Sequence, residues 1–371
     1  MRTKTIRKFV FGGLLVTSGI LCAPLYIISE RVARPNRYHL LSSNPAEGLK
    51  TLWTDKRMNL KQREEIYGKD PLYSLFTKLY GDMCHDPMTD FGSDFENVEF
   101  DSSEEVGLTL RGWVVPAKNS TNTMVILCHG AFTDRREMLR HCKYLCSSGY
   151  DCMLFDFRDH GTSDSTLKRG TSLGIREHQD IIDAVNKIKS MPAYRSKSIV
   201  VMGSSTGAAS AILAASKDIR INMVIAENPF SHRRKQVKEA LRDAFDRSGQ
   251  WGGEKNEKYN KILSLISVPQ WYVDLAAFVC DYRSVVGSGY SLKNTLEVID
   301  VVNKIAPRPL LLIHGTDDRM VKISHSEQLY ESAGQPKDLW RVEKGRHSML
   351  HQLNTNLYEE RIVSFIKDNL V

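Results

Sequence analysis

A serine held on a tight turn is the first residue of this sequence that could do chemistry. The β-branched run at residues 199–202 ends in Gly203-Ser-Ser-Thr-Gly207, and an alanine-rich stretch follows at once. Between a strand and a helix, Gly-x-Ser-x-Gly holds its central serine on a sharp turn with the hydroxyl exposed above the sheet. The glycines leave room for the neighbouring strand and helix. We therefore expect Ser205, and not Ser204, to be a nucleophile that attacks acyl carbonyl groups.

A carboxylate and a histidine that could activate Ser205 follow later in the chain. Asp318 comes after the apolar run at residues 310–313, and His347 comes shortly after a second run at 339–342. The carboxyl ends of parallel strands meet at one edge of a sheet, so both side chains would lie near the serine. His347 would then act as general base, and Asp318 would orient its imidazole. Asp317 is the alternative acid and His351 the alternative base.

These motifs resemble those of the α/β-hydrolase family, particularly its serine-aminopeptidase-like and membrane-anchored acyl-hydrolase members. The matching segments span roughly residues 95–371 and lie at 124–130, 155–163, 203–207, 314–321 and 345–347. The resemblance implies a doubly wound, mostly parallel sheet with a small helical cap, and a Ser205–Asp318–His347 triad. Two residues depart from the family pattern, because Lys322 replaces a proline and Arg346 replaces the glycine before the histidine.

The resemblance also implies an oxyanion hole made of backbone N–H groups. In the family, one N–H belongs to the residue after the nucleophile, here Thr206, and the other to an earlier loop. Ala131 is our choice for the second donor, and Phe132 is the alternative. Such donors stabilise the transition state by a few kcal/mol each, roughly 3 kcal/mol in measured cases.

Other potential metal ligands lack the spacing of known metal motifs. His129 and His160 are not part of a His-Glu-x-x-His or Cys-x-x-Cys pattern, and we expect them to support turns at the sheet edge. His129 and Asp134 match the His-x-x-x-x-Asp pattern of glycerolipid acyltransferases, which we interpret as coincidence. The seven cysteines also lack disulfide or zinc spacing and are expected to be small buried apolar residues. We expect no metal and no cofactor.

An uncharged apolar run near the N-terminus predicts a membrane anchor. Residues 9–28 are twenty residues without a charge, and basic residues flank both ends. This length suits a bilayer-spanning helix, whereas a cleaved signal peptide is usually shorter and followed by a small-residue cleavage site. We therefore expect a single-pass membrane protein. The side of the membrane that the catalytic domain faces stays open. Basic charges flank both ends of the run, the cysteines lack disulfide spacing, and Asn119-Ser-Thr is a glycosylation sequon.

The basic charge of the chain is concentrated around this anchor. Residues 1–37 hold seven Lys/Arg and one Glu, which leaves 51 − 7 = 44 basic and 44 − 1 = 43 acidic residues elsewhere. The rest of the chain is therefore nearly neutral, and the charge does not indicate nucleic-acid binding.

The sequence divides into three parts. Residues 1–37 form the basic flank and anchor, 38–94 a helical pre-segment, and 95–371 the α/β domain with a cap insertion at about 231–305. Helical spacing predicts a helix at 175–188. Strands are expected at 98–101, 108–115, 125–128, 152–157, 199–202, 223–226, 310–313 and 339–342, the last six being parallel.

The functional prediction is a membrane-anchored serine hydrolase that cleaves an acyl ester, thioester or amide through an acyl-enzyme. A small or lipid-like acyl substrate would suit the anchor. A serine peptidase of the aminopeptidase-like type and an acyltransferase using the same triad are alternatives, as is a non-catalytic anchored scaffold. The sequence leaves the acyl chain length and the oligomeric state open.

Overall fold

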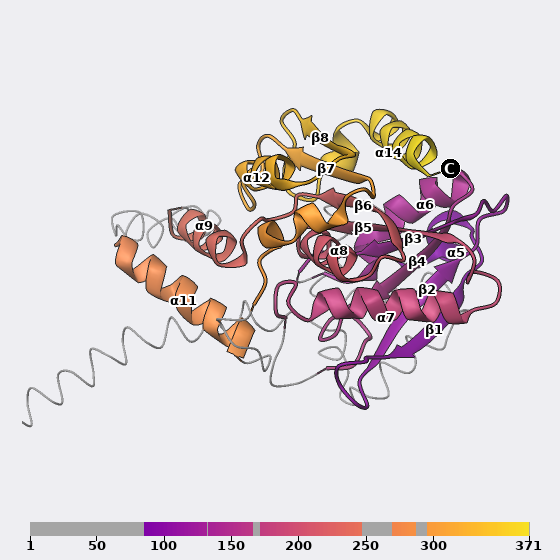
Figure 1. The fold of residues 1–371 in the computed structure, drawn as a ribbon, viewed down its shortest axis with the longest axis horizontal. Coiled ribbons are helices and arrows are strands. Elements are labelled where there is room, and N and C mark those ends of the chain that lie inside the picture. The colour runs from indigo at the N-terminus through magenta and orange to yellow at the C-terminus, as the bar shows by residue number, and fades with distance from the viewer. Residues whose placement is uncertain (1–84, 132, 166–170, 247–268, 287–294, 371) are drawn as a thin grey trace, which may run out of the picture.

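A single eight-stranded sheet forms the centre of the computed structural model, which describes residues 85–370 except 132, 166–170, 247–268 and 287–294 (Figure 1). The strand order is β1-β2-β4-β3-β5-β6-β7-β8. β1 pairs antiparallel with β2 and β2 antiparallel with β4, whereas all other neighbours are parallel. The strands are β1 Glu96–Asp101, β2 Thr109–Val115, β3 Thr123–Cys128, β4 Asp151–Asp156, β5 Ser198–Ser204, β6 Ile221–Glu227, β7 Leu310–Gly315 and β8 Lys337–Val342.

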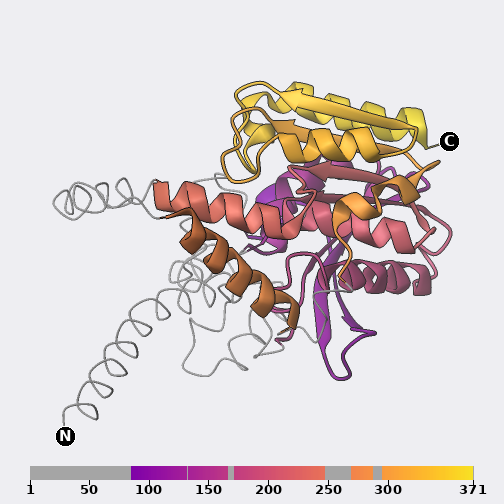
Figure 2. The same ribbon diagram turned by 60° about the vertical axis from the view of Figure 1, so that its left-hand side comes forward.

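Helices cover both faces of the sheet (Figures 1 and 2). α7 and α8 pack on one face, and α6 and α14 pack on the other. The α-helices are α5 Pro87–Phe91, α6 Leu139–Ser147, α7 Glu177–Ser190, α8 Thr206–Lys217, α9 Arg233–Asp246, α11 Gln270–Val286, α12 Ser324–Ser332, α13 Leu350–Leu353 and α14 Thr355–Asn369. Short 3-10 helices are η2 Arg135–Met138, η5 Val298–Asp300 and η6 Val302–Ile305.

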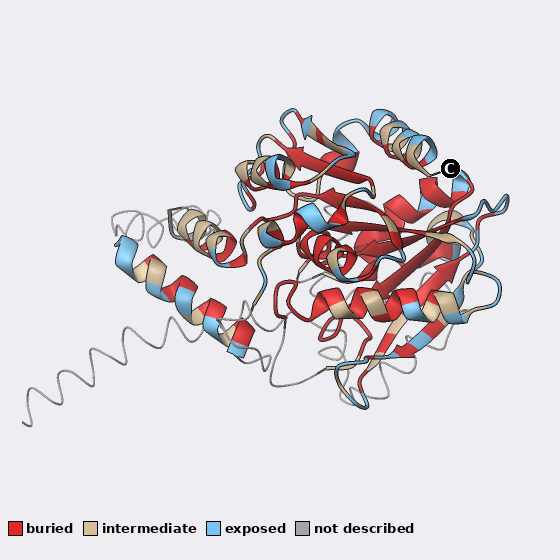
Figure 3. Cartoon of the chain, in the orientation of Figure 1, coloured by how far each residue is buried: buried red, intermediate tan, exposed pale blue. Residues whose placement is uncertain are grey.

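The central strands are buried on both faces, which explains their continuous apolar runs (Figure 3). Along β3, Met124 and Ile126 join the core under α7 and α8, whereas Val125 and Leu127 join the core under α6 and α14. Successive side chains of a strand point to opposite faces, so every residue of β3 is used in packing. A rigid sheet of this kind fixes the positions of the loops at the carboxyl ends of its strands.

The insertion between β6 and β7 contains two packed helices, α9 and α11, which lie to one side of the sheet (Figure 1). Val273, Ala276 and Cys280 are buried on one face of α11. A buried ion pair between Arg233 and Asp281 joins the two helices. These helices fall inside the segment 231–305 that the sequence predicts as a cap.

The structure confirms the mostly parallel α/β sheet and corrects some element boundaries. α7 begins at Glu177, two residues after the predicted start. β4 ends at Asp156, one residue earlier than predicted, because the N–H of Phe157 donates to Nε2 of His129 (3.1 Å) and not to a neighbouring strand. The predicted anchor at 9–28 and residues 38–84 of the pre-segment lie outside the described residues. Within the described part of the chain, no helix combines the length and apolar character that a bilayer crossing needs.

Candidate active site

Ser205 lies at the apex of the turn between β5 and α8. Its backbone has φ 53° and ψ −114°, a left-handed conformation that a non-glycine residue rarely adopts. A Cβ on Gly203 would lie 2.4 Å from the backbone of Gly207, and a Cβ on Gly207 would lie 2.4 Å from the carbonyl oxygen of Cys128. Only glycine fits at both positions, so the sequence motif enforces the turn. Ser205 is half-buried, whereas Ser204 is buried.

Asp318 and His347, which the sequence predicts as the acid and the base, contact each other. Nδ1 of His347 lies 2.6 Å from Oδ2 of Asp318. The other oxygen, Oδ1, accepts the N–H groups of Met320 and Val321, each at 2.9 Å. Asp318 is buried, but the neighbouring Asp317 is exposed. The geometry therefore supports Asp318, and not Asp317, as the orienting acid.

The loops that carry these two residues are joined through their backbones. The N–H of Thr316 donates to the carbonyl of Val342 (3.0 Å), and the N–H of Asp317 donates to the carbonyl of Gly345 (2.9 Å). A Cβ on Gly315 would lie 2.3 Å from the carbonyl oxygen of Gly345. The backbones approach so closely only because both residues are glycines. This close packing holds the histidine loop against the acid loop.

Ser205 and His347 are brought to the same place through their neighbours. The hydroxyl oxygens of Ser204 and Ser348, which adjoin them in sequence, are 3.4 Å apart. Among the described residues, no hydrogen bond joins Ser205 to His347. Catalytic hydrogen bonds are often long without substrate and tighten when it binds. His351, the alternative base, instead bonds Glu359 through Nε2 (2.9 Å).

The charge state of His347 is set by two opposing effects. Burial lowers the pKa of His347, but the charge and hydrogen bond of Asp318 raise it, so that the pKa lies above its ordinary value. The buried Glu137 and Glu227 add to this increase in the pKa. An imidazole in this environment is well suited to accept a proton, because its charged form is stabilised.

The loop predicted to carry an oxyanion donor lies beside Ser205. A Cβ on Gly130 would lie 3.5 Å from Cβ of Ser205, so the adjacent Ala131 is close to the nucleophile. Thr206 is the first residue of α8, and the first N–H groups of a helix have no acceptor within that helix. Both predicted donors are thus near Ser205. Phe132, the alternative donor, lies outside the described residues.

Glu137 supports this loop, a role that its sequence context does not predict. Its buried carboxylate accepts the N–H of Gly130 (2.8 Å) and the hydroxyl of Thr133 (2.5 Å) through Oε2. In the sequence Glu137 stands among Arg135, Arg136 and Arg140, where it looks like an ordinary surface residue. It is buried because η2 turns the chain back under the loop.

A second buried glutamate that the sequence analysis missed, Glu227, lies behind the site at the end of β6. Its carbonyl accepts the N–H of Ser205 (2.8 Å), and its carboxylate accepts the hydroxyl of Tyr358. Burial raises the pKa of Glu227. The only sequence signal is that a glutamate directly follows the apolar run 223–226. The charge of this buried carboxylate raises the pKa of His347.

A cavity of about 310 Å³ opens beside His347. The described residues that line it are Asp317, Arg319, Met320, Arg346 and His347. The candidate base is therefore accessible to a small molecule, although its side chain is only 15% exposed.

The other histidines that could suggest a metal or acyltransferase site stabilise turns. Nδ1 of His129 lies 2.7 Å from the carbonyl oxygen of Gly130, and its Nε2 accepts the N–H of Phe157. Nδ1 of His160 lies 2.8 Å from the carbonyl oxygen of Arg158. Asp134 forms a buried ion pair with Arg136 (2.8 Å). The match of His129 and Asp134 to an acyltransferase motif is therefore explained by two separate structural roles.

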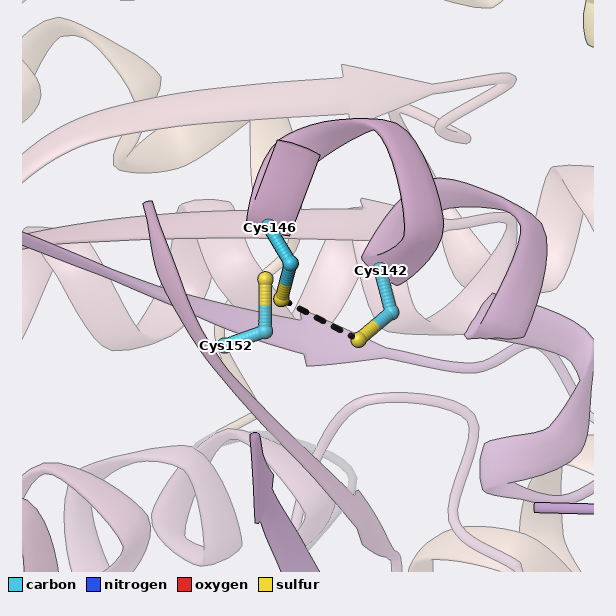
Figure 4. Close-up of side chains that lie close together, drawn as sticks. All are labelled: Cys142, Cys146 and Cys152. Atoms are coloured by element: carbon cyan, nitrogen blue, oxygen red, sulfur yellow. Dashed lines mark hydrogen bonds between the residues drawn. The ribbon is translucent and has the colours of Figure 1, made fainter. Parts of the chain in front are cut away.

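Three buried cysteines lie close together on α6 and β4 (Figure 4). The sulfur atoms of Cys142, Cys146 and Cys152 are within 4.8 Å of one another. Burial raises the pKa of Cys142 and of Cys152, whereas hydrogen bonds with these two thiols lower the pKa of Cys146 to about 5. A structural zinc site usually has four ligands, so three thiols alone do not define one. All three are buried, as the sequence predicts for the cysteines.

A comparison with protein-family models shows the family to which the chain belongs. The model described as Serine aminopeptidase, S33 matches residues 119–354, which include Ser205, Asp318 and His347. The chain belongs to this family of α/β hydrolases. The match covers well over half of the chain.

Relatives of this S33-family chain include an uncharacterised bacterial protein and a fungal protein named as a transferase. The uncharacterised protein YqkD of Bacillus subtilis is 27% identical over 294 residues, covering 78% of this chain and 85% of YqkD. The polyketide transferase GrgF of a Penicillium species is 26% identical, covering 66% of this chain and 86% of GrgF. An esterase of Pyrococcus furiosus has a similar structure, with a TM-score of 0.58 and 23% identity over 76% of this chain and 94% of the esterase. The esterase likeness supports the fold.

Proposed function

We propose that this S33-family chain is a serine hydrolase that cleaves an acyl ester or thioester through an acyl-enzyme. The observation that carries the proposal is the 2.6 Å contact between His347 and Asp318 beside the strained turn of Ser205. Family membership supports an enzyme of the hydrolase type.

In the proposed mechanism, Oγ of Ser205 attacks the acyl carbon while Nε2 of His347 takes its proton. Asp318 stabilises the imidazolium, and the N–H groups of Ala131 and Thr206 bind the carbonyl oxygen as it becomes negative. Collapse of the tetrahedral intermediate breaks the bond to the leaving group, which receives the proton from His347. Water then attacks the acyl-enzyme by the same route, releasing the acid and restoring Ser205.

Acyl transfer is the second candidate, because the related GrgF is named a polyketide transferase. The same acyl-enzyme would then be attacked by an alcohol or amine in place of water. Peptidase activity has less support within the described cap, because Asp281 and Asp274 pair with Arg233 and Lys238. Neither carboxylate is left to bind the charged amine of a peptide.

The proposed substrate is lipid-like, and the proposed location is a membrane reached through residues 9–28. Exposed apolar side chains at helical spacing along α11 support this proposal: Trp271, Leu275, Phe278 and Tyr282 are each at least 40% exposed. Contiguous exposed apolar residues commonly mark contacts with membranes, proteins or ligands. The charge-free run at 9–28 would keep the enzyme near lipid substrates.

Labelling with a fluorophosphonate probe tests the proposal, because the probe reacts covalently with activated serines. The wild-type chain should be labelled, and Ser205→Ala should not. Ser204→Ala is a matched control, because its hydroxyl has a single weak contact at 3.4 Å and should be dispensable. Equal labelling of the wild type and Ser205→Ala would refute the assignment of the nucleophile.

A further inference from the structure

Two arginines from different loops share the cavity with the proposed base. Arg319 follows Asp318 on the β7 loop, and Arg346 precedes His347 on the β8 loop. Both side chains line the cavity of about 310 Å³ together with His347. The cavity therefore has two guanidinium groups in its wall.

These arginines are not used to stabilise the fold. Within the described part of the chain, neither Arg319 nor Arg346 takes part in an ion pair, and both are exposed. Other arginines of the domain form ion pairs with carboxylates, for example Arg136 with Asp134 and Arg158 with Asp180. Asp317 is the single carboxylate among the described lining residues, so the wall carries a net charge of 2 − 1 = +1 before His347 is counted.

An anion is the ligand that such a wall would recognise. A guanidinium group presents several N–H donors in a plane that matches a carboxylate or phosphate. Met320, which is 54% exposed, adds an apolar surface to the same cavity lining. The combination suits a molecule with a carbon skeleton and a terminal anionic group.

The position of the cavity indicates which part of the substrate would carry the anion. In the proposed mechanism His347 returns its proton to the leaving oxygen or sulfur, so the leaving group must lie against His347. The acyl carbonyl oxygen lies instead toward Ala131 and Thr206. Arg346 adjoins His347 in sequence and lines the same cavity, so a leaving group that enters this cavity would lie near both side chains.

We propose that Arg319 and Arg346 select substrates whose leaving alcohol or thiol carries a carboxylate or phosphate. The inference rests on the proposed hydrolase function and narrows its substrate class. Anion binding there adds no step to the chemistry, because the arginines act on substrate binding alone.

Matched aryl acetates test this inference in the full-length protein. The substrates are 3-acetoxybenzoate and its neutral isostere 3-acetoxybenzamide, with 3-acetoxyphenyl phosphate to compare phosphate with carboxylate. The wild type should prefer the anionic esters by roughly tenfold in kcat/KM, mainly through a lower KM, which corresponds to about 1.4 kcal/mol. The preference should decrease with added salt, because the cavity is open to solvent.

Substitution of the arginines should remove the preference. Arg346→Gln and Arg319→Gln should each reduce the anionic-to-neutral ratio several-fold, and the double variant should bring it near one. The ratio is taken within one protein sample, so a partly unfolded variant does not affect it. Arg341→Gln is the control, because this exposed arginine pairs with Glu327 (3.2 Å) outside the described cavity lining, and it should keep the wild-type ratio.

The possible outcomes separate this inference from the proposed function. Hydrolysis of charged and neutral esters at equal rates, or an unchanged ratio in the double variant, would overturn the anion site and leave the hydrolase proposal standing. A preference that follows a charge on the acyl part, tested with 4-nitrophenyl hydrogen glutarate against its neutral methyl ester, would overturn the assignment to the leaving group. A wild type that hydrolyses none of these esters and resists fluorophosphonate would refute the proposed function, and this inference with it.

Discussion

Asp318 holds His347 with one carboxylate oxygen and is itself held by the other. Oδ2 contacts Nδ1 of the imidazole at 2.6 Å, while Oδ1 accepts two backbone N–H groups of its own loop. The carboxylate cannot rotate away without losing all three contacts. It therefore fixes both the orientation and the tautomer of the histidine, leaving Nε2 to accept a proton.

Loss of the Asp318 charge should reduce turnover much more than it affects folding. In Asp318→Asn the amide can keep the loop contacts through its oxygen, but its NH2 group would favour the wrong tautomer of His347. We expect kcat to fall by about 10³–10⁴-fold. Asp317→Asn is the matched control, because Asp317 is exposed, and kcat should change less than about threefold. Rates of ester hydrolysis and thermal unfolding of both variants test this prediction. A larger loss of turnover in Asp317→Asn than in Asp318→Asn would assign the acid role to Asp317.

The raised pKa of His347 predicts the pH dependence of catalysis. The base must be neutral, so kcat/KM should rise with pH through a limb above about 6.5, the ordinary pKa of histidine. In Asp318→Asn burial still lowers the pKa but the carboxylate no longer raises it, so the limb should move to lower pH. By linkage, the interaction of His347 with Asp318 stabilises the fold fully below about pH 6.5. This stabilisation is lost as pH rises through the raised pKa of His347. A limb at the same pH in both proteins would contradict this account.

The sheet and the triad candidates could be predicted from the sequence because each depends on local patterns. The continuous apolar runs favour buried strands, and the Gly203–Gly207 spacing favours a sharp turn between a strand and a helix. The choice between Asp317 and Asp318 could be proposed only by resemblance. It depends on which carboxylate turns inward, and two backbone hydrogen bonds across the loop determine that direction.

The supporting glutamates could not be predicted in this way. Glu137 is surrounded by arginines in sequence, and only the path of η2 places it under Gly130. Glu227 contacts Tyr358, 131 residues away, so its burial depends on how α14 packs against the sheet. Contacts between distant segments depend on tertiary packing, so the local patterns of one sequence do not predict them.

Glu137 should act as a positioning residue for the oxyanion loop. Glu137→Ala leaves the N–H of Gly130 without its acceptor, and we expect kcat to fall by roughly 10–100-fold, less than loss of an oxyanion donor itself. KM should change little, because the loop acts mainly in the transition state. Glu137→Gln keeps one acceptor oxygen and should recover much of the activity. Glu343→Ala, at an exposed position, is the control, and a pure KM effect would argue against this role.

Tyr358 should stabilise the fold through the buried carboxylate of Glu227. Tyr358→Phe removes the only side-chain donor described for that carboxylate, and the free energy of unfolding should fall by about 1–3 kcal/mol. Burial raises the pKa of Glu227 in the folded state, so stability is lost as pH rises from the ordinary pKa of a glutamate through the raised one. The variant should therefore be more destabilised at pH 8 than at pH 5. Urea unfolding at both values measures this, with the exposed Tyr282→Phe as control.

The run at residues 9–28 should remain in the mature protein as a membrane anchor. About twenty mostly apolar residues inserted in hydrocarbon bind far more strongly than a peripheral helix, and the flanking basic residues can stay at the two interfaces. The full-length protein should therefore resist extraction by carbonate and high salt and require detergent. A truncated chain that begins at Arg37 should be released by these treatments and still react with fluorophosphonate, because Ser205, Asp318 and His347 all lie beyond it. Intact mass distinguishes the anchor from a signal peptide, since a mature chain that begins after residue 28 would show that the run is cleaved.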